Sequence, residues 1–160
     1  MLIKPELAEK MNEQVRNEFA ASLQYLAIAI YFEKESMDNT AAFFYAQAQE
    51  ENEHGMKLLR YVVETGGDAK LLPIPAPQAV INSADAAFQT SLNWELEVTG
   101  QINVLMDMAK QQNDYLAENF LQWFVDEQLE EVTTMEKYLN LVRKMGDRNI
   151  FMLEQLIKRG

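Results

Sequence analysis

Glycine and proline are nearly absent from the long stretches of this chain that carry apolar residues, and this feature restricts the fold to long helices. The 160 residues include only six glycines and four prolines. From 5 to 35 there is no glycine and no second proline, and apolar residues recur at helical spacing. Breaks rich in capping residues or in proline separate such stretches. The sequence predicts helices over 5–35, 40–65, 83–111, 114–144 and 148–158, all in one domain spanning 1–160.

The lengths of the connections predict how these helices are arranged. The first and second helices are joined by a few residues, as are the third and fourth, so each pair should be antiparallel. The loop 68–82 has 15 residues, three of them proline. Fully extended, it could span on the order of 50 Å, whereas a 27-residue helix is roughly 40 Å long. We therefore expect an all-α four-helix bundle with one long crossover loop and a short fifth C-terminal helix.

Composition and charge exclude several function classes. The formal net charge is −11, so nucleic acid and anionic membranes would repel the chain, and neither is expected as a partner. No cysteine is present, which excludes disulfides, thiolate zinc sites and iron–sulfur clusters. No stretch approaches the roughly 20 apolar residues of a membrane span, and residues 1–6 show no signal-peptide pattern. We expect a cytoplasmic protein, or an organellar one if the chain is a processed form.

Polar residues interrupt the apolar stripe of every long predicted helix near its middle. A single glutamate on such a stripe is ordinarily a boundary residue that reaches solvent. An unpaired carboxylate inside a bundle costs several kcal/mol, and several carboxylates together repel one another. A bound metal ion resolves both problems, because it neutralises the carboxylates that ligate it. The residues concerned are Glu18, Glu51, His54, Glu95, Gln128 and Glu131.

The spacing of these polar residues distinguishes them from chance surface glutamates. Glu18 and Glu51 are 33 residues apart, and so are Glu95 and Gln128. Each half ends in an i, i+3 pair, Glu51 and His54 in the first half and Gln128 and Glu131 in the second. A single offset of 77 residues superposes the two halves. One inward glutamate from each of two helices, with an i, i+3 pair from each of the other two, is the ligand pattern of dinuclear iron or manganese bundles.

The donor types favour iron or manganese as the metal. Oxygen donors with one imidazole suit these ions, whereas zinc sites ordinarily use more nitrogen or sulfur. Structural calcium sites are ordinarily loops of oxygen ligands rather than facing helices. The residues alone therefore predict a dinuclear metal site inside a bundle and leave iron and manganese open.

Over essentially its whole length, the sequence resembles the ferritin family, in particular the non-haem bacterial-type ferritins. The most specific matches are NEFAASLQY at 17–25, EENEH at 50–54 and FLQWFVDEQLEE at 120–131. The resemblance implies a ferritin-like fold and iron as the metal. It implies that Glu18, Glu51 and His54 bind a first iron, that Glu51 bridges to a second, and that Glu95 and Glu131 complete the second site.

The same resemblance implies roles for residues around the iron pair. Glu50, Glu127 and Glu130 look like a third, weaker iron site. Tyr25 looks like the family's site tyrosine, which hydrogen-bonds near the irons and can supply an electron, although from the residue alone it would be core packing. Trp123 matches the family pattern, with packing as the alternative to a redox role. The catalytic set implied in this way is Glu18, Tyr25, Glu51, His54, Glu95, Gln128 and Glu131.

One departure separates this chain from related classes. The second i, i+3 pair, Gln128 and Glu131, lacks a histidine. Bacterioferritins and rubrerythrins carry a Glu-x-x-His pair in both halves, so the asymmetry favours a ferritin proper, with a more labile second iron. No haem-binding methionine is evident, and no haem is expected.

The activity implied by the resemblance is ferroxidase chemistry with iron storage. Two Fe(II) ions would be oxidised by dioxygen or hydrogen peroxide, and Fe(III) would be stored as a mineral inside a hollow oligomeric shell, expected to be a homo-oligomer of twenty-four subunits. The segment 147–158 resembles the helix that lines the four-fold axes, and Glu118 resembles an acid of the three-fold channels.

Three rival functions remain open on the sequence. A dinuclear-iron oxidoreductase would need an organic substrate pocket or an electron-transfer partner. A DNA-protecting mini-ferritin has its site between subunits and usually basic tails, whereas this chain has a complete set within one bundle and is acidic. A purely structural bundle would leave four buried carboxylates unexplained.

Overall fold

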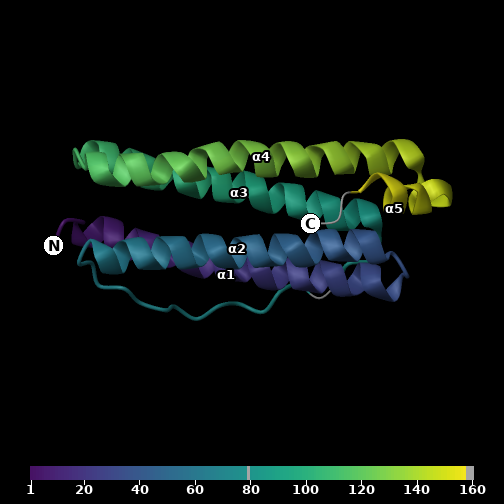
Figure 1. Ribbon diagram of the computed structural model, residues 1–160, viewed down its shortest axis with the longest axis horizontal. Helices are drawn as coiled ribbons and strands as arrows, with labels where there is room; N and C mark the ends of the chain where they lie inside the picture. The colour runs from purple at the N-terminus through teal and green to yellow at the C-terminus, as the bar shows by residue number, and fades with distance from the viewer. Residues whose placement is uncertain (79, 158–160) are drawn as a thin grey trace.

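Two antiparallel helical hairpins pack side by side and form a four-helix bundle (Figure 1). The computed structural model describes residues 1–78 and 80–157, and every regular element in those ranges is helical. The first hairpin consists of α1 (Pro5–Lys34) and α2 (Asp38–Glu64), and the second of α3 (Ala84–Gln111) and α4 (Tyr115–Met145). This arrangement confirms the predicted fold class. Within these same ranges, none of the helices combines the length and apolar character needed to cross a bilayer.

Local capping chemistry sets the helix ends. The Ser83 side chain accepts a hydrogen bond from the Ala86 backbone N–H at 3.0 Å, and the Asp114 carboxylate accepts one from Ala117 at the same distance. The α2 helix begins at 38, two residues before the expected start, and ends just before Gly66, whose φ of +77° suits glycine. Side-chain caps therefore begin both helices of the second hairpin, whereas the N-cap residues of α1 and α2 provide none.

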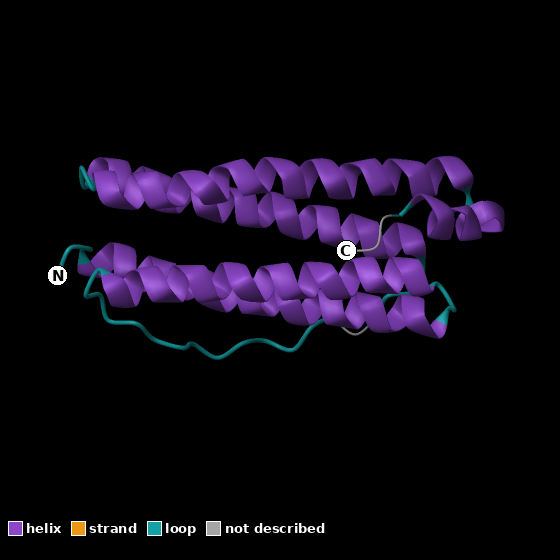
Figure 2. Cartoon of the chain, in the orientation of Figure 1, coloured by secondary structure: helices purple, strands orange, loops and turns teal. Residues whose placement is uncertain are grey.

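The connection between the hairpins runs along the length of the first hairpin, as Figure 2 shows. Buried amides of α1 hold it there. The Asn12 side chain donates to the Asp68 carbonyl at 2.8 Å and accepts from the Lys70 backbone N–H at 3.1 Å. Further along, the Gln24 carbonyl oxygen accepts from the Gln78 N–H at 2.9 Å. This segment is the predicted crossover, and it makes α2 and α3 parallel members of the bundle.

The short C-terminal element differs in detail from the expected helix over 148–158. It consists of a 3-10 helix, η1 (Asp147–Met152), followed by one α-helical turn, α5 (Leu153–Leu156), while the expected end at 158 lies outside the described residues. Gly146 is the N-cap residue of η1, and no side chain caps this helix. The segment instead turns at Gly146, whose φ is +67°, and the Asn149 N–H donates to the Gly146 carbonyl three residues back. That bond is the 3-10 type.

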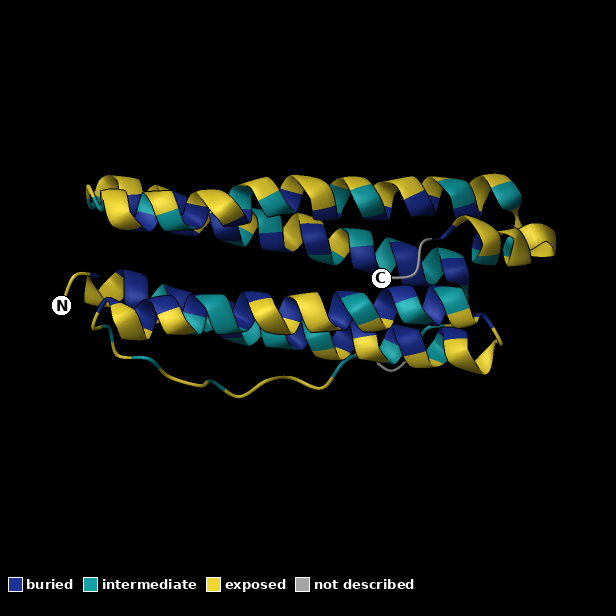
Figure 3. Ribbon diagram, viewed as in Figure 1, coloured by how far each residue is buried: buried dark blue, intermediate teal, exposed yellow. Residues whose placement is uncertain are grey.

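A polar layer divides the bundle interior into two apolar clusters. Figure 3 shows the buried faces of the four long helices turned toward one another. One cluster is centred on aromatic rings, including Phe32, Phe44, Phe88 and Tyr138. The other is mainly aliphatic and includes Leu7, Met11, Leu58, Ile102 and Leu121. Along every long helix the two clusters are separated by the residues that the sequence singled out, Glu18, Glu51, His54, Glu95, Gln128 and Glu131.

Candidate metal centre

All six residues of the predicted dinuclear pattern lie in this one buried layer. Each has at most 5% of its surface exposed. Every long helix contributes at least one of them, because the helical period of 3.6 places the i, i+3 pairs on the inward face. Charged side chains are seldom buried to this extent unless they are paired or ligate a metal. The structure therefore brings the six side chains together in the middle of the bundle.

Two overlapping groups of potential ligand atoms occupy the layer. Glu18, Glu51 and His54 offer atoms that lie within 4.8 Å of one another, and so do Glu51, Glu95 and Glu131. Glu51 belongs to both groups, which is the position that a bridging carboxylate requires. His54 Nδ1 faces the first group, 3.5 Å from Glu51 Oε2 and 4.0 Å from Glu18 Oε2.

Two carboxylate oxygens of the layer have no protein partner. Glu18 Oε2 and Glu51 Oε1 are buried and accept no hydrogen bond within the described structure. A buried acceptor without a partner is costly, and a carboxylate oxygen in this state is an available ligand for a hard cation. The oxygen and imidazole donors thus fit a pair of metal ions.

Burial and mutual repulsion shift the carboxyl groups of the layer toward their neutral forms. Burial raises the pKa of Glu18 well above its usual value, and the Glu51 carboxylate raises it further. Burial likewise raises the pKa of Glu51, with Glu95 as the next cause. Burial and the Glu95 charge raise the pKa of Glu131 to about 9. The pKa of Glu95 rises only to about 7, because the effect of burial is opposed by hydrogen bonds from Tyr25 and Gln128. A cation would replace these protons on binding.

Hydrogen bonds orient the second group. The Tyr25 hydroxyl donates to Glu95 Oε1. Gln128 Nε2 lies 3.1 Å from the Glu95 carbonyl, 3.3 Å from its Oε2 and 3.1 Å from Thr99 Oγ1. Tyr25 is fully buried, and burial followed by the Glu95 charge raises its pKa well above the usual range. Tyr25 and Gln128 are therefore neutral hydrogen-bond donors that hold the Glu95 side chain in place.

Two buried glutamines that the sequence did not single out also orient carboxyl groups of the layer. Gln14 Nε2 donates to Glu18 Oε1 at 2.8 Å, and Gln47 Nε2 donates to Glu131 Oε2 at 2.8 Å. Each lies four residues before a ligand candidate on its own helix, Gln14 before Glu18 and Gln47 before Glu51. That i, i+4 spacing could have identified Gln14, whereas the partner of Gln47 is Glu131 on α4, which no local spacing identifies.

The three residues predicted for a third site are only partly assembled. Glu127 is half-buried and groups with His54 and Glu131 within 4.8 Å. Glu50 and Glu130 are exposed, and in the described part of the chain neither belongs to a ligand group. Partial desolvation raises the pKa of Glu50, and the Glu127 and Glu130 carboxylates raise it further, so the three lie within electrostatic reach.

Trp123 covers His54 on the outer side of the layer. The two rings meet edge to face with centroids 5.3 Å apart, and Lys57 Nζ lies 3.5 Å above the indole. Trp123 is 37% exposed, so it closes the histidine off while remaining at the surface.

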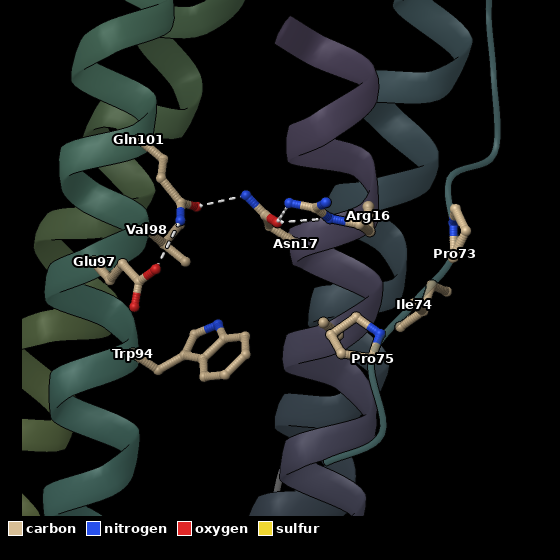
Figure 4. A pocket seen from close by; sticks show the side chains of 10 residues that line it. Arg16, Asn17, Pro73, Ile74, Pro75, Trp94, Glu97, Val98 and Gln101 are labelled. Carbon is tan, nitrogen blue, oxygen red and sulfur yellow. Dashed lines mark hydrogen bonds between the residues drawn. The ribbon is translucent and has the colours of Figure 1, made fainter. Parts of the chain in front are cut away.

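A pocket of about 530 Å³ lies outside this layer, between α1, α3 and the crossover (Figure 4). A chain of hydrogen bonds crosses it, from Arg16 to Asn17, from Asn17 to Gln101 and from Gln101 to Glu97. None of the six buried polar residues lines it.

Comparisons with known proteins agree with this geometry. The family model described as a ferritin-like domain matches residues 8–145. A bacterial non-heme ferritin of Staphylococcus aureus is 37% identical over 146 residues, which is 91% of this chain and 88% of that protein. One of Staphylococcus epidermidis is 38% identical over the same shares. The open pore ferritin of Archaeoglobus fulgidus superposes with a TM-score of 0.94 at 32% identity, covering 98% of this chain and 96% of that one. With this sequence match, this bundle and this layer of carboxylates, the chain belongs to the ferritin family.

Proposed function

We propose that this chain is an iron-storage ferritin subunit that oxidises Fe(II) at a dinuclear centre within its own bundle. The observation that supports this most is the buried layer of four glutamates and one histidine with two unpartnered carboxylate oxygens. Such a layer is unfavourable for a structural bundle, because each buried charge costs several kcal/mol. It is favourable for a protein whose substrate is a divalent cation.

In this proposal, Glu18, Glu51 and His54 hold the first Fe(II), and Glu51 bridges to the second. Glu95 and Glu131 complete the second position, with Gln128 beside it. The overlapping ligand groups support this division. The carboxyl groups with raised pKa values release their protons as Fe(II) enters, so binding weakens as the pH falls.

The reaction balances as a two-electron step. Each Fe(II) loses one electron, so the pair reduces one dioxygen to hydrogen peroxide with two protons, or one hydrogen peroxide to two waters with two protons. Supplying both electrons together avoids one-electron oxygen radicals. Tyr25, which donates to Glu95, is placed to supply a further electron.

The two iron positions are unequal, and this favours product release. The first group contains the imidazole, whereas the second consists of three carboxylates. Fe(III) therefore leaves the second position more easily. Glu50, Glu127 and Glu130 form the proposed third site, and the half-buried Glu127 offers the first step toward it.

Storage requires a shell, for which we propose a homo-oligomer of twenty-four subunits. Exposed apolar side chains supply surfaces for such contacts. Leu23, Leu26 and Ile30 lie on one face of α1 at helical spacing, and Phe151 and Leu156 project from the C-terminal segment. Glu118 is the proposed channel acid, and the absence of cysteine fits a reducing compartment such as the cytoplasm.

The test is aerobic loading of purified, metal-free protein with several hundred Fe(II) per presumed shell, followed by sizing chromatography. Soluble ferric iron that co-elutes with a very large particle is the expected result. A small oligomer that oxidises no more than two irons per subunit would instead indicate a dinuclear-iron oxidoreductase, and the storage proposal would be wrong.

A further inference from the structure

Gly55 occupies the middle of α2, directly after His54, where a glycine weakens the helix relative to alanine. The ring of Phe19 on α1 occupies the space that a side chain would need. A Cβ placed at Gly55 would lie 2.7 Å from Phe19 Cε1 and 2.9 Å from Cδ1. Both distances are shorter than any ordinary contact of such atoms, so the glycine is needed for the ring to lie there.

The two partners of this contact are the sequence neighbours of two ligand candidates. Phe19 follows Glu18 on α1, and Gly55 follows His54 on α2. Glu18 Oε2 and His54 Nδ1 are 4.0 Å apart, each aimed at the first metal position. The separation of the α1 and α2 backbones at this level therefore sets the gap that a cation must fill.

A second contact fixes the same pair of helices one turn away. The half-buried Ser22 hydroxyl donates to the Ala48 carbonyl of α2 at 2.6 Å. With Phe19 on Gly55, this bond gives α1 and α2 two points of attachment, and Glu51 of the bridging position lies between Ala48 and Gly55 on α2. Two such points determine both the spacing and the register of the helices.

We propose that Phe19 and Gly55 are positioning residues for the first metal position. The ring-on-glycine contact holds α1 close enough to α2 for Glu18 to reach a cation held by Glu51 and His54. This inference rests on the proposed dinuclear centre and adds to it a size-matched pair that touches no metal.

The direct test is Gly55→Ala, with Co(II) as a spectroscopic probe of the histidine-containing position. The added methyl group meets the Phe19 ring; under the proposal the helices separate to accommodate it, and we expect Co(II) affinity to fall by on the order of tenfold. Gly100→Ala is the matched control, because a Cβ at this α3 glycine meets nothing within 4 Å. It should bind Co(II) like the unmodified protein. Circular dichroism and sizing chromatography establish that each variant folds and assembles.

A double-mutant cycle separates positioning from a general effect on the helix. In a Phe19→Ala background the clash is absent, so adding Gly55→Ala should leave Co(II) affinity unchanged. If Gly55→Ala binds Co(II) as Gly100→Ala does, the ring has swung away and the contact positions nothing. If it weakens binding equally in both backgrounds, the glycine acts without Phe19. Either result overturns the inference.

The same variants keep this inference separate from the storage proposal. Co(II) binding does not require oxidation, so the cycle gives its answer even if unmodified protein stores no iron. Conversely, a normal iron-loading result with an unchanged Gly55→Ala variant rejects the positioning role alone.

Discussion

At the scale of single residues, the polar layer is a set of buried carboxyl groups whose neutral forms are favoured. Burial raises their pKa values, and amide and hydroxyl donors from Gln14, Gln47, Gln128 and Tyr25 hold their oxygens in place. The layer therefore has a fixed geometry before any cation binds, and under the proposed function this prepares it to capture a divalent ion.

His54→Ala or Glu18→Ala should abolish fast iron oxidation while leaving the fold intact. Each removes a proposed ligand of the first position, and the loss in initial rate should be at least on the order of a hundredfold. The measurement is the initial rise of ferric absorbance after mixing with Fe(II). Glu53→Ala, exposed on the same helix as His54, is the control and should keep the normal rate. A normal rate in either ligand variant would refute the assignment.

Glu131→Gln should change how the stability of metal-free protein depends on pH. The pKa of a glutamate in the unfolded chain is about 4.3, whereas the pKa of Glu131 in the folded protein is about 9. Between these values the folded state binds more protons, so stability is lost as the pH rises. Because glutamine cannot ionise, the variant should become more stable relative to the unmodified protein as the pH rises from 5 to 9. Urea unfolding measures this difference. Glu136→Gln, exposed on α4, should show no such gain, and a constant difference for Glu131→Gln would contradict the shift.

At the scale of elements, each long helix supplies one part of the layer, and the Glu154 side chain attaches the C-terminal turn to α2. The Glu154 carboxylate accepts hydrogen bonds from the Asn39 and Thr40 backbone N–H groups, both at 2.8 Å, at the start of α2. The Asn39 side chain donates back to the Glu154 carbonyl at 2.6 Å. An acidic group in the first turn also complements the helix dipole.

Glu154→Ala should loosen the C-terminal segment without affecting the metal centre. Losing this cap should cost about 1 kcal/mol and speed hydrogen exchange in residues 147–157, as mass spectrometry can follow. Gln155→Ala, exposed beside it, is the control. Unchanged exchange in Glu154→Ala would mean that buried Leu153 and Ile157 hold the segment by packing alone.

At the scale of the whole molecule, the bundle presents apolar surfaces that its own chain does not cover. Phe151 is 64% exposed and Met152 54%, on the segment that Glu154 fixes against α2. If the proposed shell uses this surface, Phe151→Glu should reduce it to smaller oligomers by analytical ultracentrifugation while helix content stays the same. Iron would then precipitate instead of remaining soluble. Arg148→Glu, on the exposed start of the same segment, controls for added negative charge. An intact large particle in Phe151→Glu would exclude this surface from the assembly.

Much of the fold follows from periodicity and caps. Long stretches free of glycine and proline, with Ser83 and Asp114 before two of them, define helices from local interactions alone. The short C-terminal element was predicted less accurately, because its hydrogen bonds depend on the turn at Gly146 and on docking against α2 rather than on local propensity.

The sequence by itself determined which six polar residues face inward, because helical spacing and a repeated offset are properties of residue order. Only the tertiary structure decided that Gln47 orients Glu131, that Glu50 and Glu130 stay at the surface, and that Phe19 lies on Gly55. These features depend on contacts between different helices, set by how closely their backbones approach and how deeply each face is buried. No local pattern encodes such distances, since they arise only when the helices pack together.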